Sequence, residues 1–176
     1  PGVYREEVSP RWAGTKDAPI VYRSAEPRAA VITGAEPVKD WVHFQEDVWM
    51  VTIPNDAFGN YNPYTTLVWG DWLDQIVPCH TGDVFLGEKS LYEQDSLEKV
   101  LHPVEDESSW DKEFTKHTWY TAQSEDGEST LIYANFQGKN PNQEDVEITY
   151  RPHCFYPAQE HVNYITLTGF VVTKAA

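Results

Sequence analysis

The chain has 176 residues, which suits one domain, or one domain carrying an insertion, with a core that needs no disulfide staples. Its formal net charge of −15, from 28 acidic and 13 basic residues, repels phosphate backbones and anionic lipid. Nucleic acid and membrane surfaces are therefore poor partners, whereas a neutral oligosaccharide is not repelled. Aromatic residues make up 14% of the chain, a composition common where sugar rings bind.

The sequence gives weak signals of its compartment. It begins at Pro1 without a methionine and without a signal peptide, so we expect a natural chain that continues on both sides. Two cysteines, Cys79 and Cys154, do not form a disulfide framework, and no Asn-x-Ser/Thr acceptor occurs. These features favour a cytoplasmic location. No apolar run approaches the roughly 20 residues that span a membrane.

Residues 1–37 contain three short β-prone runs, at 3–8 (VYREEV), 18–22 (APIVY) and 29–34 (AAVITG). They are separated by Gly, Pro and Asp rather than by segments long enough for a helix, which argues against βαβ units. Closely spaced short strands are typical of the rungs of a parallel β-helix. A small sandwich would show the same pattern.

Residues 38–150 show the pattern of antiparallel strands. Predicted hairpins join 41–44 to 48–53, 84–86 to 90–92, and 118–123 to 129–135. The last contains Asp126-Gly127, a strong hairpin signal. One short helix is expected, capped by Asp95 with Glu98 three residues later, and ended by Pro103.

Residues 151–176 again show short β-prone runs like those of residues 1–37. The segment 162–172 (VNYITLTGFVV) predicts a strand, a tight bend at Gly169 and a second strand, and it echoes residues 19–34. A β-helix stacks like residues on successive rungs. We therefore predict an all-β fold in which a β-sandwich (38–150) is inserted between rungs of a right-handed parallel β-helix (1–37 and 151–176).

The stretch 55–82 is the best candidate for a binding site, because loops carry function more often than scaffold does. Gly70-Asp71-Trp72 places an indole beside a carboxylate at a turn. An indole face stacks on a pyranose while a carboxylate accepts its hydroxyl hydrogen bonds. The alternative is a Trp packed over a turn that Asp71 caps. The candidate substrate-binding residues are Trp72, Asp71, His80, Tyr64 and Asn62.

Other chemistries find little support. A retaining glycosidase needs two carboxyl groups about 5 Å apart, and nothing singles out a pair among the plentiful candidates, which are Asp71, Asp74, Asp83, Glu6 and Glu7. Cys79-His80 and His153-Cys154 are zinc-type residues, but neighbours on a strand face opposite ways and the usual zinc spacing is missing. We expect no metal and no cofactor.

Several motifs stand together in one order. They are residues 1–6 (PGVYRE), 60–64 (NYNPY), 70–72 (GDW), 82–86 (GDVFL), 133–138 (YANFQG), 140–142 (NPN), 147–148 (EI), 154–157 (CFYP) and 163–170 (NYITLTGF). Together they resemble the right-handed β-helix glycoside hydrolases of the family 120 β-xylosidase type. The resemblance covers essentially the whole chain.

The resemblance implies a retaining exo-hydrolase that removes xylose from xylooligosaccharides without a metal. It implies that both catalytic carboxylates lie on later rungs, beyond residue 176, so the chain alone should be inactive. It places an aromatic pocket contact on Trp72. The family often has paired histidines where this chain has Cys79-His80, which leaves the role of His80 open. The alternatives are a stand-alone carbohydrate-binding module, or an oligomerisation domain of a hydrolase or polysaccharide lyase that contacts a second copy through the sandwich or an exposed β-helix edge.

Overall fold

The computed structural model describes residues 1–71 and 79–176. Contacts divide the chain into two compact units, one formed by residues 1–35 with 151–176 and the other by residues 36–150. The expected division placed the first boundary after residue 37, and the contacts place it after residue 35. No helix in the part of the chain that the structure describes is long and apolar enough to cross a membrane.

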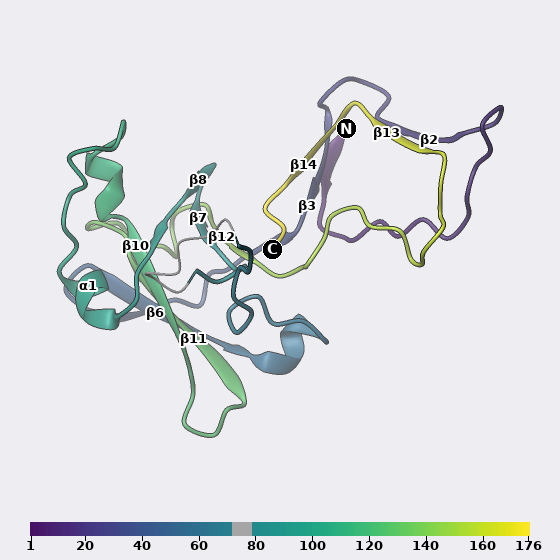
Figure 1. Ribbon diagram of the computed structural model, residues 1–176. Coiled ribbons are helices and arrows are strands. Elements are labelled where there is room, and N and C mark those ends of the chain that lie inside the picture. The colour runs from purple at the N-terminus through teal and green to yellow at the C-terminus, as the bar shows by residue number, and fades with distance from the viewer. Residues whose placement is uncertain (72–78) are drawn as a thin grey trace. The chain divides into compact units, whose positions relative to one another are not determined.

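The second unit, which we call the sandwich unit (36–150), contains two mainly antiparallel sheets (Figure 1). The first sheet has, in spatial order, β5 (Val42–Gln45), β6 (Val48–Pro54), β11 (Ser129–Asn135), β10 (Thr118–Gln123) and β9 (Tyr92–Glu93). The second has β4 (Ala35–Pro37), β12 (Val146–Thr149), β7 (Val84–Leu86) and β8 (Lys89–Ser90). The three expected hairpins are confirmed as the antiparallel pairs β5–β6, β7–β8 and β10–β11.

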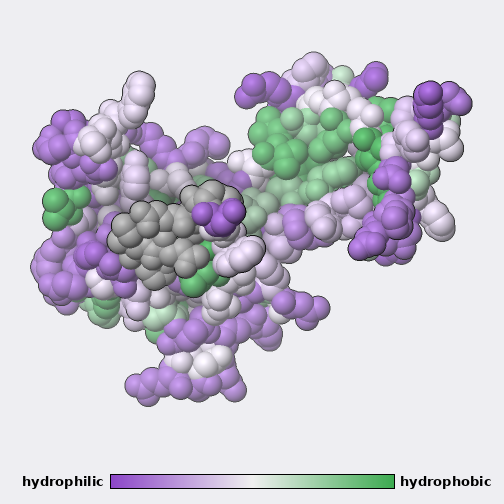
Figure 2. All heavy atoms as spheres, viewed as in Figure 1, coloured by the Kyte–Doolittle hydropathy of each residue, from purple (hydrophilic) through white to green (hydrophobic). Residues whose placement is uncertain are grey.

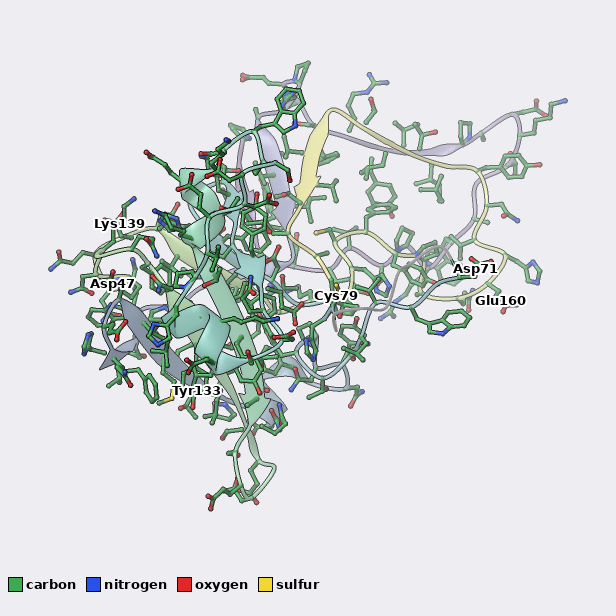
Figure 3. The ribbon with its side chains drawn as sticks, turned by 60° about the vertical axis from the view of Figure 1, so that its left-hand side comes forward. Asp47, Asp71, Cys79, Tyr133, Lys139 and Glu160 are labelled. Carbon is green, nitrogen blue, oxygen red and sulfur yellow. The ribbon has the colours of Figure 1, made fainter. Side chains whose placement is uncertain are left out.

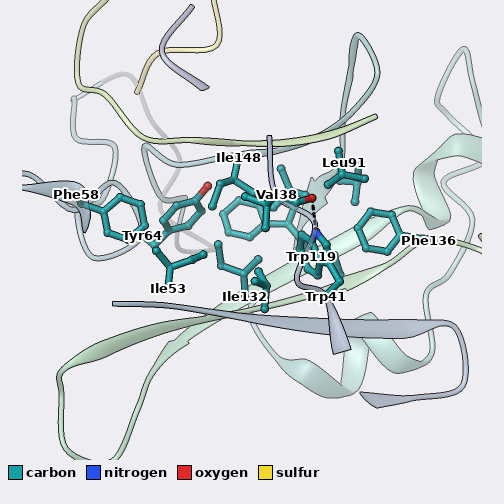
Figure 4. Close-up of a cluster of buried hydrophobic side chains, with 14 residues drawn as sticks. Val38, Trp41, Ile53, Phe58, Tyr64, Leu91, Trp119, Ile132, Phe136 and Ile148 are labelled. Carbon is teal, nitrogen blue, oxygen red and sulfur yellow. Dashed lines mark hydrogen bonds between the residues drawn. The ribbon is translucent and has the colours of Figure 1, made fainter. Parts of the chain in front are cut away.

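The core of the sandwich unit consists of alternate side chains from the strands together with aromatic residues from the loops (Figure 4). On β11, Ile132 and Ala134 are fully buried while Tyr133 between them is half-exposed, as the two-residue period of a strand requires. The rings of Trp41 and Phe136 meet edge to face with their centroids 5.2 Å apart. The indole Nε1–H of Trp41 donates to the carbonyl of Val38 at 3.2 Å, so this buried donor is satisfied.

The expected helix is present as α1 (Leu97–Leu101), but its N-cap residue is Ser96 rather than Asp95. No side chain caps the helix, and the Asp95 carboxylate instead accepts from Lys99 Nζ at 2.6 Å. Asp95 precedes the N-cap, so this ion pair joins the first turn of the helix to the residue before its cap. Two 3-10 turns, η1 (Asn55–Phe58) and η2 (Glu113–Lys116), complete the helical segments of the described residues.

The first unit, which we call the parallel unit (1–35 with 151–176), is built from five short strands. They are β1 (Gly2–Tyr4), β2 (Ile20–Arg23), β3 (Ala30–Thr33), β13 (Ile165–Thr168) and β14 (Phe170–Thr173). β13 pairs with β2 from Ile165 opposite Ile20, and β14 pairs with β3 from Phe170 opposite Ala30, both in parallel. The echo seen in the sequence is therefore a pairing in register, and the bend at Gly169 has a φ of 80°.

The parallel unit is less fully packed than the sandwich unit. All three residues of β1 are exposed, and β2 and β13 alternate between half-buried and exposed residues. A hollow of about 180 Å³ opens among mainly apolar side chains, including Tyr22, Phe155 and Phe170. Figure 2 shows hydrophobic residues gathered over the strands β1, β3 and β14. The apolar side chains of this unit are thus only partly covered by the chain itself.

Candidate functional site

The candidate site lies in the loop region between β6 and β7 of the sandwich unit, which the structure describes at residues 55–71 and 79–83. The side chain of Asn62 forms three hydrogen bonds within this region. Its amide Nδ2 donates to Asn55 Oδ1 at 3.0 Å and to Thr130 Oγ1 at 2.8 Å, and its Oδ1 accepts the backbone N–H of Tyr64 at 2.9 Å. These bonds tie the loop to β11, so the side chain of Asn62 has a scaffold role here.

Tyr64 belongs to the core rather than to a ligand-facing surface. Its side chain is 2% exposed, and its hydroxyl donates to the carbonyl of Asp83 at 2.8 Å. Its ring meets that of Trp119 edge to face at 5.7 Å. Burial raises the pKa of the Tyr64 hydroxyl well above its usual value. The sequence predicted a sugar contact, but a ring enclosed on all sides has no face to offer, and Tyr64 leaves the candidate set.

Residues 66–68 and 79–81 of the loop pair with each other in a short antiparallel ladder. Leu67 lies opposite His80 in an antiparallel bridge, and the N–H of Val68 donates to the carbonyl of Cys79 at 2.7 Å. A second hydrogen bond of the same ladder runs from the N–H of Thr81 to the carbonyl of Thr66, at 2.9 Å. The ladder fixes His80 beside the chain that leads to residues 69–71.

An exposed indole stands just beyond this ladder. Trp69 is 85% exposed, and Asp71, two residues later, is also exposed (Figure 3). Trp72 lies outside the described residues. Trp69 was not predicted as a contact, although its place directly before Gly70-Asp71 is a signal that the sequence contains. An exposed indole next to an exposed carboxylate is the pairing that a neutral sugar ring can use.

His80 is held by Glu93, a residue that the sequence analysis also missed. Glu93 Oε2 accepts the backbone N–H of His80 at 2.8 Å, and Glu93 Oε1 contacts His80 Nδ1. The side chains of His80 and Glu93 are 19% and 14% exposed. Thirteen residues of sequence separate the two, so only the folded sheet brings them together.

Asp83 adds a second carboxyl group near this pair. Its Oδ2 accepts from the Ser90 hydroxyl, and its Oδ1 accepts the N–H of Val84 at 2.7 Å. Burial raises the pKa of Asp83 from 3.8 to about 6; the bonds from Ser90 and Val84 oppose this, and the charge of Glu93 adds to it. Both oxygens are engaged within the fold, which gives Asp83 a structural setting.

The described residues contain no group of three or more His, Cys, Asp or Glu able to hold a metal ion. Cys154, in the parallel unit, is buried, and its thiol donates to the carbonyl of Thr173 at 3.2 Å. Burial raises the pKa of this thiol, which keeps it in the protonated form that binds metals poorly.

Comparison with known families identifies the sandwich unit. The model of the glycoside hydrolase 120 insertion domain matches residues 38–148, which is more than half of the chain. The chain belongs to the glycoside hydrolase 120 family. The matched residues fall within the sandwich unit (36–150), so the family's insertion domain and this unit coincide.

A solved structure described as the complex of XylC with xylose is similar to the chain over 99% of its length, with 40% sequence identity and a TM-score of 0.89. The chain spans 29% of that solved chain. No curated protein sequence matches the chain. The all-β fold and the glycoside hydrolase 120 resemblance expected from the sequence are both confirmed.

Proposed function

We propose that this chain is part of a β-xylosidase of the glycoside hydrolase 120 family, in which the sandwich unit supplies one wall of the sugar pocket. The observation that carries the proposal is the similarity, at 40% identity over 99% of the chain, to a structure solved with xylose. The in-register parallel pairs β2–β13 and β3–β14 support the further proposal that the parallel unit forms rungs of a β-helix.

Within the sandwich unit, the proposed sugar contacts are Trp72, Asp71 and His80, with Trp69 added on the basis of its exposure. Asn62 serves by holding the loop that presents them. The proposed substrate is a neutral xylooligosaccharide, which a chain of net charge −15 does not repel. We propose that the catalytic carboxylates lie outside these 176 residues, so that the chain by itself does not hydrolyse an aryl β-xyloside.

Titration with xylobiose, followed by Trp fluorescence, tests the pocket-wall role. We expect a saturable change that Trp72→Ala and Trp69→Ala weaken. Trp110→Ala is the control, because Trp110, like Trp69, is largely exposed to solvent but lies in a different loop of the sandwich unit. A response that is absent at millimolar sugar, or that depends on Trp110 instead, would contradict the proposal.

The outer face of the five-stranded sheet favours a second role, in contact with another copy of the chain. Cross-strand register places Tyr120, Tyr133, Met50 and Val42 in one row that faces away from the core. Phe44 joins it, with its ring 5.1 Å from that of Tyr133, and remains 43% exposed. Light scattering tests this role, with a dimer that Phe44→Asp converts to monomer as the expected result and a wild-type monomer at all concentrations as the contrary one.

A further inference from the structure

Glu93 is anchored by the sheet and not by the loop that it contacts. It ends β9, where it lies opposite Trp119 of β10, and the next residue, Gln94, donates its N–H to the carbonyl of Trp119 at 2.8 Å. The carboxylate of Glu93 contacts two groups of His80: it accepts a hydrogen bond from the backbone N–H, and it lies against the ring atom Nδ1. The ladder with residues 66–68 fixes the backbone of His80, and Glu93 fixes the orientation of its imidazole.

The contact between Glu93 and Nδ1 also determines which ring nitrogen of His80 carries the proton. An ionised carboxylate only accepts hydrogen bonds, so the Nδ1 atom that faces Glu93 must be the donor. In a neutral imidazole the other nitrogen, Nε2, is then an acceptor with a lone pair. Among the described residues, Nε2 of His80 has no hydrogen-bond partner, while the side chain keeps 19% of its surface exposed.

We propose that Glu93 is a positioning residue that holds His80 in the Nδ1–H tautomer, so that His80 Nε2 accepts a hydrogen bond from a sugar hydroxyl. This inference rests on the proposed function, and it assigns His80 a specific part in it. On the ladder, His80 lies opposite Leu67. Leu67 precedes the exposed Trp69 by two residues in the chain. A hydroxyl group can donate, so an oriented acceptor at His80 Nε2, on the same ladder that leads to an exposed indole, suits a sugar ring.

Glu93 does not contact the sugar in this account. Its side chain is 14% exposed, and each of its two oxygens already meets His80. A carboxylate that fixes the tautomer and orientation of a neighbouring imidazole is a recurrent arrangement wherever a histidine must present one defined nitrogen. The sugar therefore meets the imidazole, and Glu93 acts through it.

The tautomer is measured directly by two-bond proton–nitrogen correlation of the ¹⁵N-labelled chain, at a pH at which His80 is neutral. We expect the Nδ1–H form to dominate. Glu93→Gln should produce a mixture of both forms, because an amide can donate to Nδ1 as well as accept from it. Glu125→Gln is the matched control, since it removes the same charge from an exposed turn. A dominant Nε2–H form, or spectra that Glu93→Gln leaves unchanged, would overturn the inference.

Xylobiose affinity tests the second half of the inference. Only the fraction of Glu93→Gln in the Nδ1–H form keeps the acceptor at Nε2, so a roughly equal mixture should weaken binding about twofold, whereas Glu125→Gln should leave it unchanged. His80→Asn provides a sharper variant: its amide can still donate to Glu93 from near the position of Nδ1, but it has no atom where Nε2 stood. Because the acceptor is lost in every molecule, we expect His80→Asn to weaken binding about three- to tenfold while its thermal midpoint stays close to that of the wild type.

The two measurements separate the two proposals. If Glu93→Gln alters the tautomer but leaves the affinity unchanged, the sugar contact is wrong and Glu93 only stabilises the loop. If the wild type binds no xylobiose, the proposed function and the sugar contact both fail. The tautomer spectra then still decide whether Glu93 positions His80.

Discussion

The two units of this chain bury their β-strands to very different extents. In the sandwich unit (36–150), all four residues of β12 are buried, and fourteen buried side chains of the described residues form one cluster. In the parallel unit (1–35 with 151–176), β1 is exposed along its length, and only β3 is mostly buried. A sandwich closes its own core between two sheets, whereas a parallel stack is stable only where its neighbours cover it. The sandwich unit should therefore carry most of the stability of the chain.

The largest expected effect comes from truncating the core of the sandwich unit. Ile132→Ala removes three carbon atoms from a site with no exposed surface and should lower the free energy of unfolding by about 2–5 kcal/mol. Val21→Ala, on a residue of the parallel unit that is 45% exposed, should lower it by less than about 1 kcal/mol. Urea unfolding followed by near-UV circular dichroism gives both values. Equal losses would contradict the expectation that the sandwich unit carries most of the stability.

A smaller effect depends on pH and on one buried carboxyl group. Because the folded pKa of Asp83 lies near 6 and its ordinary value is 3.8, the folded state holds a proton between these values that the unfolded state has released. The free energy of unfolding should therefore fall as pH rises from 4 to 7, by about 2–3 kcal/mol from this group.

Asp83→Asn should remove that fall, because an amide can still accept from Val84 N–H and meet the Ser90 hydroxyl without carrying charge. Unfolding curves collected at intervals from pH 4 to pH 7 test this. A variant whose stability falls with pH as steeply as that of the wild type would show that Asp83 titrates alike in both states.

Two glycines offer the finest comparison between the units. A Cβ atom at Gly82 would lie 2.8 Å from Cε1 of the buried Tyr64 ring, so Gly82→Ala should destabilise the sandwich unit by about 1–3 kcal/mol. A Cβ atom at Gly34 would lie 2.6 Å from Cα of Ala175, in a backbone segment held by the N–H of Ala176, which donates to the carbonyl of Arg151, so Gly34→Ala should destabilise the parallel unit by a similar amount. Thermal unfolding of both variants measures the two losses, and a loss at Gly34 close to zero would contradict this expectation.

The sequence predicted those features of the fold that are set by neighbouring residues. The Asp126-Gly127 pair marks the β10–β11 hairpin because Gly127, with a φ of 72°, supplies the left-handed turn. The echo between residues 19–34 and 162–172 corresponds to two parallel pairings, β2 with β13 and β3 with β14, each made by a short β-branched run. The helix start was wrong by one residue, since Asp95 forms an ion pair with Lys99 instead of capping.

The site was predicted less completely, because its geometry depends on distant parts of the chain. Tyr64 stands in a loop-like segment, yet the bond from its hydroxyl to Asp83 draws the ring into the core. The contact between Glu93 and His80 arises only when β9 joins the sheet beside β10. Neither the burial of the first residue nor the pairing of the second has a signature in local sequence.

We propose that the loop region of the sandwich unit forms one wall of a sugar pocket. Chemical-shift mapping of the ¹⁵N-labelled chain during a xylobiose titration tests it most directly. We predict that the shifts of Trp69, Asp71 and His80 move together and saturate, while those of Tyr133 and Phe44 on the outer sheet face stay still. Shifts confined to the outer face or to the parallel unit, or no shifts at millimolar sugar, would contradict the claim.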